Sequence, residues 1–190
     1  MREHQETKKE ILNLAEGLLR DRGFNGFSYK HISSALDVKN AAVHYHYPTK
    51  SDLGVAIIQR ARRGFQKWTQ NSKMQNLDFP KKLDEFFGIY RYFLKCGQHV
   101  CLGGALETDF KTLPIEMQQE TRALASDILN WLQELLKKGR EAGSFSFPGN
   151  PRDQAIVVLS SLQGALQMVR ATDPSYLNAA MKQIERMLKT

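Results

Sequence analysis

The chain has 190 residues, of which 42% are hydrophobic and 25% charged, the composition of an ordinary globular protein with a buried core. No apolar run approaches the roughly 18 residues that a membrane helix needs, and the charged opening MREHQETKKEIL lacks the apolar centre of a signal peptide. We therefore expect a cytoplasmic protein with no membrane contact, whose net charge of +7 suits a polyanionic partner.

The first predicted element is a helix near residues 6–22. Its apolar residues recur at helical spacing: Ile11, Leu12, Ala15, Leu18 and Leu19. Gly23 follows at the position where a left-handed residue without Cβ commonly ends a helix. We expect Phe24 and Phe27 to anchor the next loop in a small helical core.

A tight turn between two short helices is predicted next. Ser28 can cap the first helix, because its hydroxyl can accept from N–H groups of the opening turn. The apolar face of this helix is Ile32, Ala35 and Leu36. Asp37 tolerates the left-handed backbone that a tight turn often needs. This order of a capping residue, an apolar helix face and a turn residue indicates a helix-turn-helix.

The second helix of this unit buries little. Asn40 is expected to cap it, residues 41–47 form it, and Pro48 ends it. Only Val43 and Tyr47 are needed against the core, and the other residues are small or polar. Such a helix suits the major groove of DNA, where small side chains allow close approach to base edges. The alternative is a buried helix hairpin with a solvated polar face.

The rest of the chain is predicted to be helical, and no alternating strand pattern interrupts it. Thr49 can cap a long helix, with Asp52 in its first turn where the helix dipole favours an acid. Pro80 begins another helix, which Gly97 interrupts. The remaining helices are expected over 49–72, 101–110, 114–141, 152–171 and 174–189.

The last two helices carry more apolar surface than one hairpin can cover. We expect them to pair with a second copy in a four-helix bundle, so that the protein is a homodimer through residues 152–189. In the alternative, both helices cover the core of a monomer. A dimer also suits DNA, because two recognition helices about one helical turn (34–36 Å) apart can read a palindrome.

Residues 7–53 resemble the DNA-binding domain of the TetR family of bacterial transcription regulators. The resemblance rests on Ile11, Ala15, Leu18, Gly23, Phe24, Ser28, Ile32, Ala35, Val38, Ala42, Val43, Tyr47, Pro48, Lys50 and Leu53. Asp37 replaces the usual glycine of the turn, and His44 replaces the usual tyrosine. The resemblance implies an all-α protein with a helix-turn-helix domain over 1–50 and a helical effector-binding and dimerisation domain over 51–190. It implies a non-enzymatic regulator, most often a repressor.

Position and resemblance together identify candidate DNA contacts. The residues expected at base edges are Lys30, Asn40, Ala41, Ala42 and His44. Those expected at phosphates are Ser28, Tyr29, Tyr45, His46 and Lys50. The partner would be double-stranded DNA carrying a palindromic operator.

A small-molecule effector, implied by the resemblance, would bind an apolar pocket in the body of the protein. The candidate lining is Trp68, Phe86, Tyr90, Phe93, Cys101, Phe110, Trp131, Gln163 and Gln167. Ordinary core packing is the alternative role for each of these residues, and the more frequent one. Cys101 is either a small buried hydrophobe or, as in a thiol-responsive subgroup of the family, a reactive sensor.

No cofactor, metal or catalytic site is predicted. His44 and His46 are two residues apart and so point to different sides of a helix, unlike a chelating pair four apart. Gly103 and Gly104 lack the strand and the lysine of a phosphate-binding loop. Two other functions stay open: a non-specific DNA-binding protein, and a ligand-binding helical protein that binds no DNA.

Overall fold

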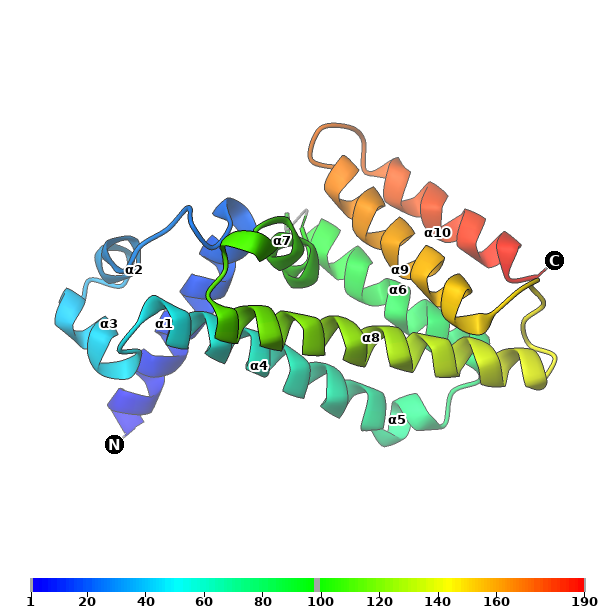
Figure 1. Cartoon of the computed structure of the whole chain (residues 1–190), viewed down its shortest axis with the longest axis horizontal. Coiled ribbons are helices and arrows are strands. Elements are labelled where there is room, and N and C mark those ends of the chain that lie inside the picture. Colours follow the sequence, from blue (N-terminus) through cyan, green and yellow to red (C-terminus); the bar gives the residue numbers. More distant parts are fainter. Residues whose placement is uncertain (1, 98–99, 190) are drawn as a thin grey trace. The chain divides into compact units, whose positions relative to one another are not determined.

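The computed structural model describes residues 2–97 and 100–189, with side chains from residue 5 onward. The described part of the chain is all-α, as predicted, and contains no β-strand, only an isolated bridge between Ser146 and Lys189. Its elements, shown in Figure 1, are α1 (Arg2–Arg22), α2 (Tyr29–Ala35), α3 (Asn40–His46), α4 (Lys50–Gln70), α5 (Ser72–Gln75), α6 (Phe79–Lys95), α7 (Leu102–Thr108), the 3-10 helix η1 (Phe110–Thr112), α8 (Ile115–Glu141), α9 (Pro151–Met168) and α10 (Ser175–Met187).

Several predicted helix boundaries differ from the structure, and two of these differences have a clear physical reason. The expected helix over 49–72 ends at Gln70, because Asn71 adopts an extended backbone and its side chain accepts from the Lys73 N–H, which starts α5. Asn40 is the first residue of α3 and does not cap it. The N-cap is Lys39, whose backbone is extended and whose side chain makes no capping bond.

The chain forms two compact units. The first contains Met1–Gly64 and Leu102–Leu124, and the second contains Phe65–Cys101 and Ala125–Thr190. The long helices α4 and α8 each contribute to both. This division by packing differs from the division by function expected at residue 50, because the start of α4 and the segment 102–124 pack with the amino-terminal helices.

The first unit has its core where α1, α2 and α3 meet. Its fully buried side chains include Ile11, Ala15, Leu19, Ile32, Val43, Leu53 and Ile57. Gly54 on α4 allows a close approach: a Cβ added there would collide with the side chain of Met117. Helix α7 packs against α1 within this unit.

The second unit is built around aromatic rings and the final helical hairpin. Phe86, Phe87, Leu132, Leu136, Leu162 and Leu166 are among its most deeply buried side chains. Helices α9 and α10 run side by side, and α6 packs against α9 (Figure 1). Position 139 of α8 requires glycine, because a Cβ there would collide with the Phe145 ring.

Within the described ranges, none of the helices combines the length and the apolar character needed to cross a membrane.

Candidate DNA-binding site

The turn between α2 and α3 has the geometry expected from the sequence. Asp37 adopts a left-handed backbone with φ +52°, a conformation that aspartate tolerates because its short polar side chain can bond locally. The Leu36 N–H donates to Ile32 O and the Val38 N–H donates to Ser33 O, both at 3.0 Å. These bonds reverse the chain and lead directly into α3.

The caps of α2 and α4 also follow the sequence. Ser28 is the N-cap of α2, and its N–H donates to Nδ1 of His31 at 3.0 Å. At the start of α4, the Thr49 N–H and hydroxyl both donate to the Asp52 carboxylate, at 2.9 and 2.7 Å. The Asp52 N–H donates back to the Thr49 hydroxyl, which completes a reciprocal capping box.

Helix α3 turns most of its side chains outward. Of its seven residues only Val43 is buried, and Tyr47, the C-cap, packs inward behind it. Asn40, Ala41, His44 and Tyr45 are exposed, while Ala42 and His46 are half-buried. Tyr45 keeps 74% of its surface accessible, a large value for an aromatic residue. The helix therefore presents a mixed small and polar surface.

His44 lies next to a backbone acceptor. Its Nδ1 is 3.1 Å from Pro48 O, a carbonyl that can only accept, so this contact is a hydrogen bond in the form that carries the proton on Nδ1. In the neutral ring Nε2 is then an acceptor. The ring also packs edge-on against Tyr29, with 4.6 Å between centroids, which fixes its direction on the surface.

Tyr29 corrects a predicted phosphate contact. It is 7% exposed, and its hydroxyl donates to Tyr47 O at 2.8 Å. Burial, assisted by the negative charge of Asp52, raises the pKa of Tyr29, so the hydroxyl stays protonated and keeps donating. Tyr29 thus ties the start of α2 to the end of α3, and its hydroxyl does not face solvent.

The structure also corrects the phosphate contact predicted for Lys50. Its ammonium donates to Phe24 O and Phe27 O, each at 2.5 Å, and lies 4.5 Å from the centroids of both phenyl rings. Burial lowers the pKa of Lys50, while the charge of Asp109 opposes that effect. The side chain therefore points into the turn between α1 and α2, where it holds the loop, and not toward a phosphate.

Several structural contacts of this unit were missed by sequence reasoning. The Asp109 carboxylate accepts from the Phe24 N–H at 2.7 Å, and the Asn25 amide donates to the Thr112 hydroxyl at 2.8 Å. Glu16 forms an ion pair with Arg20 of the same helix and a second one with Arg60, which joins α1 to α4. These partners are 4 to 87 residues apart, and most carry no local signal.

Most of the candidate effector residues form one packed cluster in the second unit. Trp68, Phe86 and Trp131 contact one another with centroids 5.2 to 6.5 Å apart, and Tyr90 and Phe93 continue the chain of rings. Phe110 is not part of it: it belongs to the first unit, with the Arg122 guanidinium 4.8 Å from its ring centroid. Gln163 is half-buried and Gln167 exposed on α9.

The cysteines differ in exposure. Cys96 is exposed and Cys101 is buried, and no disulfide joins them. A reactive thiol needs access to solvent and an environment that favours the thiolate. In this conformation the exposed position is Cys96, so a sensor role for Cys101 would require local opening.

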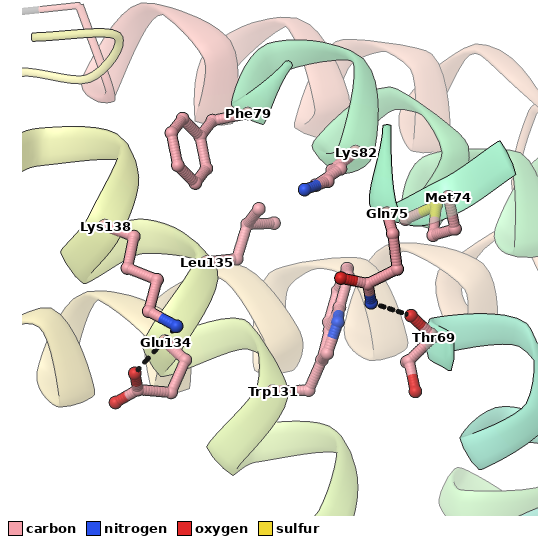
Figure 2. A pocket seen from close by; sticks show the side chains of 9 residues that line it. All are labelled: Thr69, Met74, Gln75, Phe79, Lys82, Trp131, Glu134, Leu135 and Lys138. Carbon is pink, nitrogen blue, oxygen red and sulfur yellow. Dashed lines mark hydrogen bonds and ion pairs between the residues drawn. The ribbon is translucent and has the colours of Figure 1, made fainter. Parts of the chain in front are cut away.

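A cavity of about 170 Å³ lies beside the aromatic cluster, between the end of α4, α5, the start of α6 and the carboxyl-terminal half of α8 (Figure 2). Gln75 Nε2 donates to Thr69 O at 2.5 Å, and Lys138 lies 3.9 Å from Glu134. Trp131 is the single candidate effector residue that it contains. Its lining is Thr69, Met74, Gln75, Phe79, Lys82, Trp131, Glu134, Leu135 and Lys138.

A helix-turn-helix with an outward second helix, followed by a helical body, defines a class of proteins: helical DNA-binding regulators. Residues 11–57 match the family described as "Bacterial regulatory proteins, tetR family". The whole chain is similar to the HTH-type transcriptional repressor NemR of Escherichia coli (strain K12), with 23% identity over all of this chain and 98% of the relative.

The fold is also similar to solved structures of TetR-family regulators. A TetR-family transcriptional regulator from Agrobacterium tumefaciens superposes with a TM-score of 0.92 at 25% identity, covering 98% of this chain and all of the other. A TetR transcriptional regulator from Legionella pneumophila superposes with a TM-score of 0.82 at 29% identity, covering 96% and 97%. Residues 11–57 are a DNA-binding domain of the TetR family, and the chain along its whole length is similar to transcription regulators of that family.

Proposed function

We propose that the protein is a transcriptional repressor that binds a palindromic operator as a homodimer and releases it when a small molecule binds. One observation carries the DNA-binding part: six of the seven side chains of α3 are wholly or partly exposed, although the helix is held in place at Val43 and Tyr47. A helix that buries so little adds little to the core, and a major groove would use its outward face.

The proposed base contacts are Asn40, Ala41, Ala42, His44 and Lys30, which are exposed or half-buried. Asn40 can bond bidentately to adenine, and the alanines let the backbone approach the bases. The form of His44 with the proton on Nδ1 leaves Nε2 as an acceptor for an amino group in the groove. Ser28, Tyr45 and His46 stay in the proposal as phosphate contacts, and the exposed Lys39 joins them.

The proposed homodimer uses α9 and α10. Three large apolar side chains of α9 are exposed, namely Ile156 (47%), Val157 (40%) and Met168 (51%), and Tyr176 of α10 is 45% exposed. A monomer would leave these groups in water at a cost of about 25 cal/mol per Å² of apolar surface. Burial against the same surface of a second copy, through residues 152–189, removes that cost.

The proposed effector site is the cavity at Trp131. Its lining joins apolar side chains with a larger number of polar and charged ones, so an effector there would carry polar groups of its own: the apolar residues are Met74, Phe79, Trp131 and Leu135, and the polar ones are Thr69, Gln75, Lys82, Glu134 and Lys138. An effector that fits one conformation of the protein better than another would shift the protein toward that conformation. Helix α4 connects the cavity covalently to the helix-turn-helix domain, here called the reading head. In this proposal the functional boundary between the DNA-binding domain (1–50) and the effector and dimerisation domain (51–190) falls at the start of α4.

The test is a binding-site selection with the purified protein, followed by affinity measurements against the selected and a scrambled duplex. We expect one palindromic sequence bound at least about a thousandfold more tightly than the scrambled duplex. Asn40→Ala should change the selected sequence, while the matched exposed change Asn130→Ala on α8 should not. Equal affinity for both duplexes would identify a non-specific DNA-binding protein, and no affinity for either would refute the proposal.

A further inference from the structure

The loop that leads into the helix-turn-helix is fastened to a segment far along the chain. This loop, residues 23–28, and the α7–η1 segment, residues 102–112, belong to the first unit, in which α7 packs against α1. The Asp109 carboxylate accepts from the Phe24 N–H at 2.7 Å, and Asn25 donates to Thr112 at 2.8 Å. Both bonds link main-chain or side-chain groups separated by more than 80 residues.

The geometry of Gly23 makes the Asp109 contact specific. Gly23 has φ +74°, which ends α1 and aims the next N–H at Asp109. A Cβ on residue 23 would lie 2.5 Å from Asp109 Oδ2, too close for any side chain. Glycine is therefore needed twice, once for the backbone conformation and once to admit the carboxylate.

The same loop is held from its other side by a cation. The Lys50 ammonium binds Phe24 O and Phe27 O, while Asp109 binds the Phe24 N–H. The backbone of Phe24 is therefore bonded on both sides: its N–H to the Asp109 carboxylate and its carbonyl oxygen to the Lys50 ammonium. Charge-assisted bonds of this kind are roughly twice as strong as neutral ones.

The fastened loop runs directly into α2, and α2 holds the recognition helix. Tyr29, the first residue of α2, donates to Tyr47 O at the end of α3. A short series of contacts therefore leads from Asp109 through the 23–28 loop and α2 to α3. Val43 is the buried residue of the recognition helix itself, and Tyr47, its C-cap, packs inward behind it.

We propose that Asp109 is a positioning residue for the helix-turn-helix, and that the α7–η1 segment sets the orientation in which α2 and α3 are held for DNA. The inference rests on the proposed function for its consequence at DNA, while its structural claim stands on contacts within the first unit. Moving the segment away from the loop would leave the Phe24 N–H without its acceptor and loosen α2 together with α3.

The test combines amide hydrogen exchange with DNA affinity in the full-length protein. Asp109→Ala should speed exchange at Phe24 and across α2 and α3 by about tenfold or more, with the core of α1 unchanged. Asp109→Asn should restore most of the protection, since its amide oxygen can still accept. Glu116→Ala, which removes an exposed carboxylate of α8 in the same unit, is the matched control and should change nothing.

Affinity for the selected duplex, measured well below the melting temperature, should fall about tenfold in Asp109→Ala and be largely regained in Asp109→Asn. If Asp109→Ala does not fold, Thr112→Val, which removes the neighbouring bond to Asn25, replaces it in both measurements. Unchanged exchange at Phe24 and α2, or faster exchange with unaltered affinity, would overturn the inference. A wild-type protein that selects no DNA would refute the proposed function, while the exchange data would still decide whether Asp109 positions α2 and α3.

Discussion

Lys50 offers the sharpest test of the site, because its two possible roles predict opposite outcomes. As a phosphate contact, its removal would weaken binding to every DNA sequence and leave the fold unchanged. As the structure has it, the ammonium holds Phe24 O and Phe27 O, and its removal should destabilise the fold. The perturbations are Lys50→Ala and Lys50→Met, of which methionine keeps an apolar stem over the two phenyl rings.

The magnitude follows from the contacts that are lost. A hydrogen bond from a charged donor contributes about 1.5–3 kcal/mol, and Lys50 makes two. Because the side chain is only half-buried, water can replace part of this interaction. We therefore expect Lys50→Ala to lower the free energy of unfolding by about 2 kcal/mol, and Lys50→Met by somewhat less.

The assay is urea unfolding followed by circular dichroism at fixed protein concentration, since dimer stability depends on concentration. With a slope of about 2 kcal/mol per molar urea, the midpoint of Lys50→Ala should fall by about 1 M. Lys67→Met, an exposed lysine on the same helix, is the matched control and should leave the midpoint unchanged. An unaltered midpoint in Lys50→Ala, together with uniformly weaker DNA binding, would refute the structural role and restore the phosphate contact.

Three further changes test other parts of the structure. Burial raises the pKa of Glu16, but its interactions with Arg20 and Arg60 outweigh that effect and hold the pKa below its usual range. The ionised carboxylate therefore stabilises the fold at pH values above the pKa of the unfolded state. This contribution is lost as the pH falls through the pKa of the folded state. Glu16→Gln should therefore lower the melting temperature by several degrees at pH 7 and by little near pH 3, and an equal loss at both would contradict the assignment. Tyr29→Phe removes the bond to Tyr47 O and should cost about 1 kcal/mol in urea unfolding, with faster amide exchange in α3 as the local sign; unchanged exchange would speak against the tie. Ile156→Asp places a charge on the exposed face of α9 and should shift the protein from dimer to monomer in sedimentation experiments, whereas persistence of the dimer would exclude this face.

The fold was predictable because its signals are local. Gly23 and Asp37 mark two left-handed positions, and both have positive φ in the structure. Thr49 and Asp52 form the capping box that their spacing indicates. Such features depend on residues within one turn of each other, and the same is true of helical periodicity. Where a local signal was ambiguous, as for Asn40, the predicted boundary missed by one residue, since Lys39 caps the helix through its extended backbone alone.

The direction of individual polar side chains was not predictable in the same way. Tyr29 and Lys50 lie at positions where the resemblance suggests DNA contact, yet their partners are backbone carbonyls 18 to 26 residues away. A sequence shows that a lysine has a long, flexible side chain, and it does not show which carbonyl lies within reach. The aromatic candidates for the effector site illustrate the same limit. The ring content is plain from the sequence, but the rings pack mainly against one another, and the cavity opens beside Trp131 toward polar residues that no pattern marked.

The structural contacts of Tyr29 and Lys50 bear on how the helix-turn-helix is held in place. A recognition helix must keep its outward face clear for DNA, so it cannot be secured by a large apolar contact, and in α3 only Val43 is buried. Its position depends on its packing against α1 and α2 and on directed polar bonds such as the one from Tyr29 to Tyr47 O. In this protein Tyr29 and Lys50, which lie next to that helix, bond to backbone carbonyls of the same unit.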